Sequence, residues 1–190
     1  RRRGRGGMQF RAAATQKLKP AKYPSFSLDE ERKGEIIDLV HESGRDVPLS
    51  KVRFEDGAIS FIPAPLGTKV GQRISFGLNS EIIDGNVISI QNIPDGTIVC
   101  NVEKQFGDGG SFIKTAGADA TVFSHADDGV ILKLASGKFK KLNPKNRAMI
   151  GTLAGGGVED RPFMRAGVKM MRFKSKGQKY PIVRGVAQAA

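Results

Sequence analysis

The first half of the chain's body alternates polar and apolar residues with a period of two, as half-buried strands do. Lys51-Val52-Arg53-Phe54 shows this alternation most clearly and leads into Asp56-Gly57, a favoured two-residue hairpin turn. Prolines at positions 63 and 65 end the strand that returns from this turn. Strands are therefore predicted at residues 35–40, 51–54, 58–62 and 72–76, and together they form one small antiparallel barrel.

The second half repeats the pattern with short strands and more turns. Asp128-Gly129 and Ser136-Gly137 are tight-turn pairs, so a three-stranded meander is predicted around them. Short strands at this spacing favour a second barrel over alternating strands and helices, and only residues 168–173 suggest a helical turn or two. After a short apolar stretch at 87–93, strands are predicted at residues 97–103, 120–124, 130–134, 138–142 and 148–153.

These elements predict an all-β protein in four parts, with two barrels between two extended ends. Asp84-Gly85-Asn86 marks the boundary between the barrels. The predicted parts are a basic N-terminal extension at 1–32, a first barrel at 33–84, a second barrel at 85–160 and a basic C-terminal extension at 161–190.

The charge distribution separates the ends from the body. Residues 1–23 hold eight Lys or Arg and no acid, and residues 161–190 again hold eight and none. Residues 24–110 hold eight basic and fourteen acidic residues, and residues 111–160 hold seven and five. The formal charge of +12 is thus concentrated at the ends, which indicates a polyanionic partner, either nucleic acid or an anionic membrane surface.

Acid-free ends repel themselves and have little apolar surface to bury, so we expect them to gain structure only against a counter-charge. The simpler alternative is a pair of solvated tails. Aromatic residues among the charges have two open roles, because they can stack on exposed bases or anchor each end to the body. These residues are Phe10, Tyr23, Phe26, Phe163, Phe173 and Tyr180.

Other kinds of chemistry lack the residues that they need. The chain has one cysteine, Cys100, and two histidines, His41 and His125, which excludes an internal disulfide and disfavours a metal site. Cys100 is expected as a buried thiol, and its lack of a disulfide partner fits a reducing, intracellular compartment. Ser136-Gly137-Lys138 lacks the preceding glycine and following Ser or Thr of a phosphate-binding loop. No apolar run approaches the ~20 residues that span a bilayer.

The surviving site candidates are basic. The loop from Asn143 to Arg147 carries two cations after a strand, and the last part of the chain carries cations at short intervals. Arginine offers planar two-point contacts to phosphate, and lysine acts as a point charge. The predicted RNA-contacting residues are Arg1, Arg2, Arg3, Arg5, Arg11, Lys17, Lys19, Lys22, Lys145, Asn146, Arg147, Arg165, Lys169, Arg172, Lys174, Lys176, Lys179, Arg184 and Gly185.

A series of short segments, in order along nearly the whole chain, carries a family resemblance. They are Phe10-Arg11-Ala12, Gly85-Asn86-Val87, Asn92 to Val99, Ala116-Gly117, Ala120-Thr121-Val122, Leu134 to Lys141, Asn146-Arg147-Ala148, Gly155-Gly156-Gly157 and Tyr180 to Ala187. The series resembles the large-subunit ribosomal protein two family in its archaeal and eukaryotic-cytosolic form. Asn146, Arg147, Arg184 and Gly185 fall on matching family positions, so the resemblance makes them preferred RNA contacts.

The resemblance implies an OB-fold barrel followed by an SH3-like barrel, with extended basic tails buried in large-subunit ribosomal RNA. It implies a structural constituent of the cytoplasmic ribosome that stabilises this RNA near the peptidyl transferase centre and supports subunit association and translation. The expected partners are ribosomal RNA and other ribosomal proteins, with no membrane and no small-molecule substrate. No cofactor is expected, and any magnesium ions would be bound through the RNA.

Two other classes of function have requirements of their own. A standalone single-strand binder would need exposed aromatic rings on the first barrel, with Phe54, Phe61 and Phe76 as candidates. An enzyme would need a nucleophile and a base, and no nucleophile can be assigned to His41 or His125. The family continues into an Asn-Pro, His and Gly-rich loop that this sequence does not contain, so no catalytic role is carried over.

Overall fold

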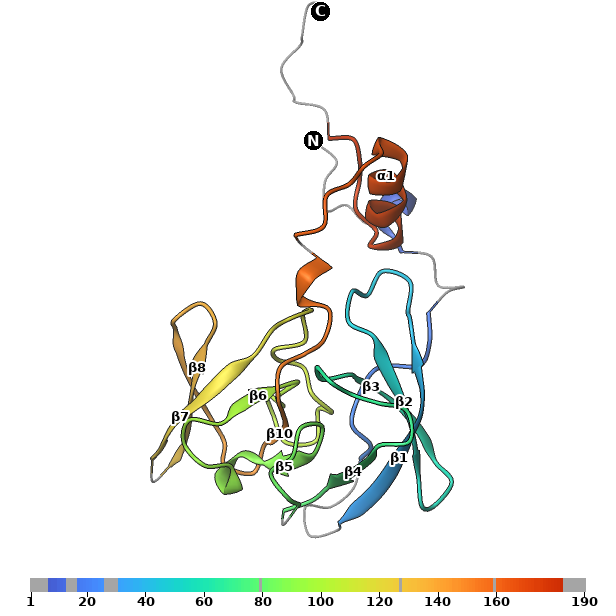
Figure 1. Ribbon diagram of the computed structural model, residues 1–190. Helices are drawn as coiled ribbons and strands as arrows, with labels where there is room; N and C mark the ends of the chain where they lie inside the picture. The colour runs from blue at the N-terminus through green and yellow to red at the C-terminus, as the bar shows by residue number, and fades with distance from the viewer. Residues whose placement is uncertain are drawn as a thin grey trace, which may run out of the picture. The chain divides into compact units, whose positions relative to one another are not determined.

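A computed structural model describes residues 7–12, 17–25, 31–78, 80–126, 128–158 and 160–182 (Figure 1). The chain is mostly β, as the sequence predicts, and divides into two compact units. Unit 1 comprises residues 1–18, 42–45 and 159–190, and unit 2 comprises residues 19–41 and 46–158.

The strands of unit 2 form one sheet with the order β3-β2-β1-β4-β5-β10-β6-β7-β8-β9. Neighbouring strands pair antiparallel, except that β4 pairs parallel with β5. The strands are β1 (Arg32–Val40), β2 (Leu49–Phe54), β3 (Ile59–Pro63), β4 (Arg73–Phe76), β5 (Val87–Ser89), β6 (Ile98–Cys100), β7 (Ala120–Ala126), β8 (Gly129–Leu134), β9 (Phe139–Leu142) and β10 (Arg147–Ile150).

Helices are short. Single 3-10 turns are η1 (Met8–Phe10), η2 (Ile90–Asn92) and η3 (Gly156–Val158), and α1 (Ala166–Ser175) is the α-helix of the described residues. The helical turns predicted at 168–173 are confirmed, and the helix is longer than predicted.

The predicted hairpins form where the turn residues require them. The Asp56 side chain accepts a hydrogen bond from the Ala58 amide at 2.9 Å, which closes the turn between β2 and β3. Ser136-Gly137 likewise joins β8 to β9, and the Leu134 amide donates to the Lys138 carbonyl at 2.9 Å. These turns set the strand register, so alternate residues face the interior.

Two apolar clusters form the core of unit 2, and three strands serve both. In β5, Val87 belongs to the first cluster and Ile88 to the second. In β10, Met149 belongs to the first cluster, while Ala148 and Ile150 belong to the second. Strand β6 divides in the same way between Val99 and Cys100, because successive side chains point to opposite faces of a strand.

One predicted strand is shorter than expected. Residues 97–103 alternate well, but β6 ends at Cys100 because Asn101 has a φ of 46°, in the left-handed region that strands do not use. Cys100 itself is fully buried, as expected. Burial, with smaller contributions from Asp119 and Asp84, raises the pKa of its thiol to about 12.

Candidate nucleic-acid interface

Unit 1 gathers cations with almost no acid. Its described residues include ten Lys or Arg and two acids, Glu42 and Asp160. Four of the cations lie exposed along the C-terminal segment, and three more are half-buried there. The exposed ones are Arg161, Arg165, Lys174 and Lys179, and the half-buried ones are Lys169, Arg172 and Lys176.

Helix α1 presents part of this charge. Arg172 and Lys174 lie in its last turn, where cations interact favourably with the negative end of the helix dipole. Past the helix end, the Gly177 amide donates to the Lys174 carbonyl at 3.0 Å, and the Gln178 amide to the Phe173 carbonyl at 2.8 Å. These hydrogen bonds satisfy carbonyls that the helix itself leaves open, so the segment turns back sharply.

Three aromatic rings of the C-terminal segment surround one of its lysines. The Lys169 ammonium lies 5.7 Å from the ring centroid of Phe163, 6.0 Å from that of Phe173 and 5.3 Å from that of Tyr180. The Arg172 guanidinium lies 5.3 Å from the Phe163 centroid. Cation–π attraction therefore contributes to holding this segment together. These aromatics thus contact their own segment, which is neither stacking on a base nor anchoring to the body, the two roles left open for them.

The two basic ends of the chain meet in unit 1. A Cβ atom on Gly177 would lie 2.8 Å from the Phe10 carbonyl oxygen, and one on Gly44 would lie 2.5 Å from the Ser175 carbonyl oxygen. Both glycines have positive φ, so they allow a backbone approach that a larger residue would block. The ends therefore pack on each other within the chain, which differs from the expectation that they gain structure only against a counter-charge.

Glu42 stabilises the 42–45 loop of unit 1 through its carboxylate. Its side chain is buried, 2.5 Å from the Arg45 guanidinium, and it accepts a hydrogen bond from the Leu18 amide at 3.1 Å. Burial alone would raise the pKa of Glu42, but the Arg45 charge, the two hydrogen bonds and Lys17 together lower it below its usual value. Glu42 therefore stays ionised inside unit 1 and offers no exposed carboxylate to repel a polyanion.

The remaining predicted contacts are spread over both units. Arg11 and Lys17 are exposed in unit 1, and Lys19, Lys22 and Lys145 are exposed in unit 2. Other predicted residues lie outside the described part of the chain: Arg1, Arg2, Arg3, Arg5, Arg184 and Gly185, together with the aromatic Phe26.

Asn146 and Arg147 lie inside unit 2, at 0% and 2% exposure. The Arg147 guanidinium is 2.6 Å from a carboxylate oxygen of Glu103, which is fully buried, and the Arg147 amide donates to the other oxygen at 3.0 Å. Asn146 donates to the Glu103 carbonyl at 3.0 Å. That these residues contact RNA stays a prediction, and in this structure their side chains stabilise the protein.

The network extends to Tyr23, an aromatic of the N-terminal region. Its hydroxyl donates to the Asn101 carbonyl at 2.5 Å, and its ring centroid lies 5.6 Å from the Arg147 guanidinium. Burial, with smaller contributions from Cys100 and Glu103, raises the pKa of the Tyr23 hydroxyl well above its usual value. Tyr23 therefore anchors the N-terminal region in the core of unit 2, which is the second of the two roles left open for it.

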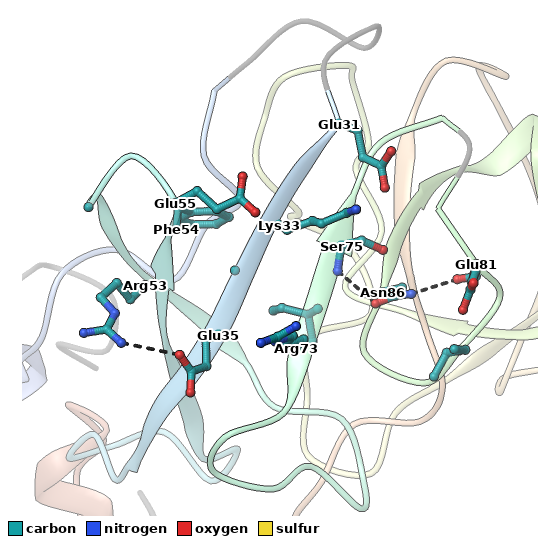
Figure 2. Close-up of a pocket in the computed structure, with 14 residues that line it drawn as sticks. Glu31, Lys33, Glu35, Arg53, Phe54, Glu55, Arg73, Ser75, Glu81 and Asn86 are labelled. Atoms are coloured by element: carbon teal, nitrogen blue, oxygen red, sulfur yellow. Dashed lines mark hydrogen bonds and ion pairs between the residues drawn. The ribbon is translucent and has the colours of Figure 1, made fainter.

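A hollow of about 810 Å³ lies over β1, β2 and β4, and its charges alternate (Figure 2). Glu35 stands opposite both Arg53 and Arg73 in the strand register, and its carboxylate is 3.4 Å from the Arg53 guanidinium. At one side, Asn86 accepts from the Ser75 amide and donates to the Glu81 carbonyl, both at 2.9 Å. This hollow is called the groove below. Its charged lining residues, the groove charges, are Glu31, Glu35, Glu55, Glu81, Lys33, Arg53 and Arg73.

Acids and cations nearly cancel in this hollow, so it has no strong attraction for a polyanion. The aromatic rings that a single-strand binder would need are not offered there either. Phe54 and Phe76 are 3% and 0% exposed, and Phe61 is half-buried. The hypothesis of a standalone single-strand binder that uses the first barrel therefore lacks its stacking surface.

The described residues contain no cluster of three or more His, Cys, Asp or Glu side chains that could hold a metal ion. The imidazole Nδ1 of His125 is 2.7 Å from the Asp95 carboxylate, and its Nε2 faces the Ile90 carbonyl at 3.4 Å. These contacts tie β7 to the turn at Pro94-Asp95-Gly96 and to η2. Within the described ranges, no helix has the length and apolar character needed to cross a bilayer.

Comparison with known proteins assigns the family. Residues 83–190 match the model of the C-terminal domain of ribosomal proteins L2. The whole chain is 71% identical to large ribosomal subunit protein uL2 of Cenarchaeum symbiosum and 70% identical to that of Nitrosopumilus maritimus, and it covers 78% of each. It is 41% identical to the uL2 protein of Sulfolobus acidocaldarius, of which it covers 79%. The chain therefore belongs to the uL2 family of ribosomal proteins, structural and non-enzymatic constituents of the large ribosomal subunit.

Proposed function

We propose that the chain binds large-subunit ribosomal RNA, with the cationic surface of unit 1 as its main phosphate-binding site. The observation that carries this proposal is that residues 161–182 hold seven Lys or Arg and no acid, and four of these cations are exposed. The acid of the 42–45 loop is buried and paired, so it does not oppose the approach of phosphates. Each Lys or Arg placed on a phosphate releases counterions, which gives binding a strong salt dependence.

The contacts proposed for the described part of unit 1 follow from exposure. They are Arg11, Lys17, Arg165, Lys169, Arg172, Lys174, Lys176 and Lys179. Lys19, Lys22 and Lys145 are proposed as contacts of unit 2. Because α1 and its aromatic contacts already fix several of these side chains, less conformational entropy is lost when RNA binds.

The finer architecture is also part of the proposal. We infer an OB-fold barrel at residues 33–84 and an SH3-like barrel at 85–160, with basic extensions at 1–32 and 161–190. The two core clusters support this division, since one draws mainly on residues before Val87 and the other on residues from Ile88 onward. Strands β5, β6 and β10 contribute to both clusters, so the proposed barrels would share a wall.

The place in the ribosome follows from the family resemblance. We propose that the chain stabilises ribosomal RNA near the peptidyl transferase centre and supports subunit association, with ribosomal RNA and neighbouring ribosomal proteins as its partners. Unit 1 suits such a role, because a surface rich in cations can hold phosphate strands that would otherwise repel one another.

The test is the salt dependence of binding to large-subunit ribosomal RNA, measured for the full chain and for a chain ending at residue 160. Each phosphate contact contributes roughly 0.7–0.9 to the slope of log affinity against log salt concentration. The eight Lys or Arg at 161–190, which the shorter chain lacks, are expected to contribute a large part of that slope. Equal slopes for the two chains would show that the 161–190 segment of unit 1 does not bind the phosphates.

A further inference from the structure

Two phenylalanines of unit 2 are exposed side by side at the edge of the sheet. Phe123 of β7 and Phe139 of β9 are 54% and 56% exposed. Their ring centroids are 4.9 Å apart, and the ring planes meet at 63°. Neither ring belongs to the two core clusters. The rings therefore form an open aromatic corner, which we call the Phe corner.

Lysines share this face of the sheet. Lys133 of β8 stands opposite Phe139, and Lys141 of β9 stands opposite Ile131. Residues paired across strands point to the same face, and alternate residues along a strand do so too, which places Lys133 and Lys141 beside the Phe corner. A register irregularity between Val122 and Ser124 leaves Phe123 without a partner in the ladder, as a β-bulge does.

Lysines predominate on the two strands beside the Phe corner. Residues 129–142, which include β8 and β9, hold four lysines and no acid. The neighbouring Asp128 bonds Lys141. This balance differs from the groove charges on β1, β2 and β4, where acids alternate with cations.

A purely structural role explains these rings poorly. A cross-strand aromatic pair can stabilise an edge strand, but its main contribution comes from burying apolar surface. Here about half of each ring stays in contact with solvent. Exposed aromatic faces next to lysines are the surface on which proteins stack unpaired bases, with the lysines placed on the flanking phosphates.

We propose that the Phe corner stacks an unpaired base of ribosomal RNA, while Lys133, which is exposed, contacts a phosphate next to it. This inference rests on the proposed function, but it concerns unit 2 and a different kind of contact. One ring supplies the stacking face, and the second ring closes the edge of the site. Because every base has a π-face, the site selects an unstacked nucleotide and not a particular base.

The test uses the full chain and large-subunit ribosomal RNA of Nitrosopumilus maritimus, whose protein is 70% identical. The double variant F123L/F139L keeps the apolar bulk and removes the aromatic faces. The matched control F123Y/F139Y keeps both faces. We expect the leucine variant to lose affinity about tenfold at fixed salt, the tyrosine variant to stay within about twofold of the native chain, and the salt slope to be unchanged in both.

The outcomes separate this inference from the proposed function. If the native chain binds with the expected salt slope and the leucine variant binds equally well, the Phe corner does not stack a base. If the leucine variant keeps its RNA affinity but loses association with other large-subunit proteins, the face is a protein-docking surface and the inference is wrong. If the native chain does not bind the RNA, both the proposed function and this inference are overturned.

Ultraviolet crosslinking of the native complex covers the case in which the leucine variant does not fold. A nucleotide attached to Phe123 or Phe139, located by mass spectrometry, would support the inference. Crosslinks found only on other residues of the chain would overturn it.

Discussion

The surface of unit 1 and the groove over β1, β2 and β4 both carry several cations, but they differ in where their acidic side chains lie. In the groove, four carboxylates lie among three cations, and Glu35 stands opposite two arginines in the strand register. In unit 1, Glu42 is buried and bound by Arg45 and the Leu18 amide, which leaves Asp160 as the exposed acid of its described residues. The comparison teaches that the placement of acids decides whether a set of cations can attract a polyanion.

The largest effect on stability is expected for Arg147, which lies in the interior of unit 2 and is paired there with a buried carboxylate. R147L would leave the carboxylate of Glu103 buried without its cation, at a cost of about 3–5 kcal/mol in the free energy of unfolding. The measurement is denaturant unfolding, with K145Q as the control because Lys145 is exposed in the same loop. K145Q should change the unfolding free energy by less than about 0.5 kcal/mol. A stable R147L protein would show that this cation does not serve the fold.

Removing acids from the groove should make its surface resemble that of unit 1. The triple variant E35Q/E55Q/E81Q leaves Lys33, Arg53 and Arg73 without most of the carboxylates that oppose them. We expect RNA affinity to rise several-fold at low salt and to return to the native value near 1 M salt, where charges are screened beyond about 3 Å. The readout is a binding titration at both salt concentrations. An unchanged affinity at low salt would mean that the groove carboxylates do not weaken the binding of RNA to the groove.

The smallest effect is expected for Glu42, because protonating or replacing it removes a single set of contacts inside unit 1. The pKa of Glu42 is lower in the folded chain than in the unfolded chain, so its contribution to stability is present above the unfolded pKa and is lost as pH falls through the folded pKa. Hydrogen-exchange protection of the Leu18 amide, which donates to Glu42, should therefore fall on acidification. In E42Q the protection should be weaker and independent of pH in this range. Equal pH dependence in both proteins would rule out Glu42 as its origin.

Local patterns in the sequence predicted the strands and turns well. The Asp56-Gly57 and Ser136-Gly137 pairs carry their own conformational preferences, so the hairpins follow from neighbouring residues alone. Local patterns failed at Asn101, where the predicted strand ends early. Its positive φ goes with contacts to the 109–113 segment that neighbouring residues do not reveal. The family was also predicted correctly, from an ordered series of segments and not from any single motif.

The candidate site was harder to predict because it depends on distant contacts. The sequence predicts Arg147 as a cation of an exposed loop, whereas the fold places Glu103 against it. The meeting of the two basic ends depends on Gly44 and Gly177, whose close contacts lie far away in sequence. Phe123 and Phe139 look like core residues, since aromatic residues in strands are usually buried, and only their exposure in the structure distinguishes them.

The most direct test compares the salt slopes of two matched triple variants binding large-subunit ribosomal RNA. R165Q/K174Q/K179Q removes three exposed cations of unit 1, and K33Q/R53Q/R73Q removes the three cations of the groove. We predict that the unit 1 variant lowers the slope of log affinity against log salt by roughly 2–3, while the groove variant changes it by less than one phosphate contact, about 0.7. Equal losses of slope in the two variants would contradict the account.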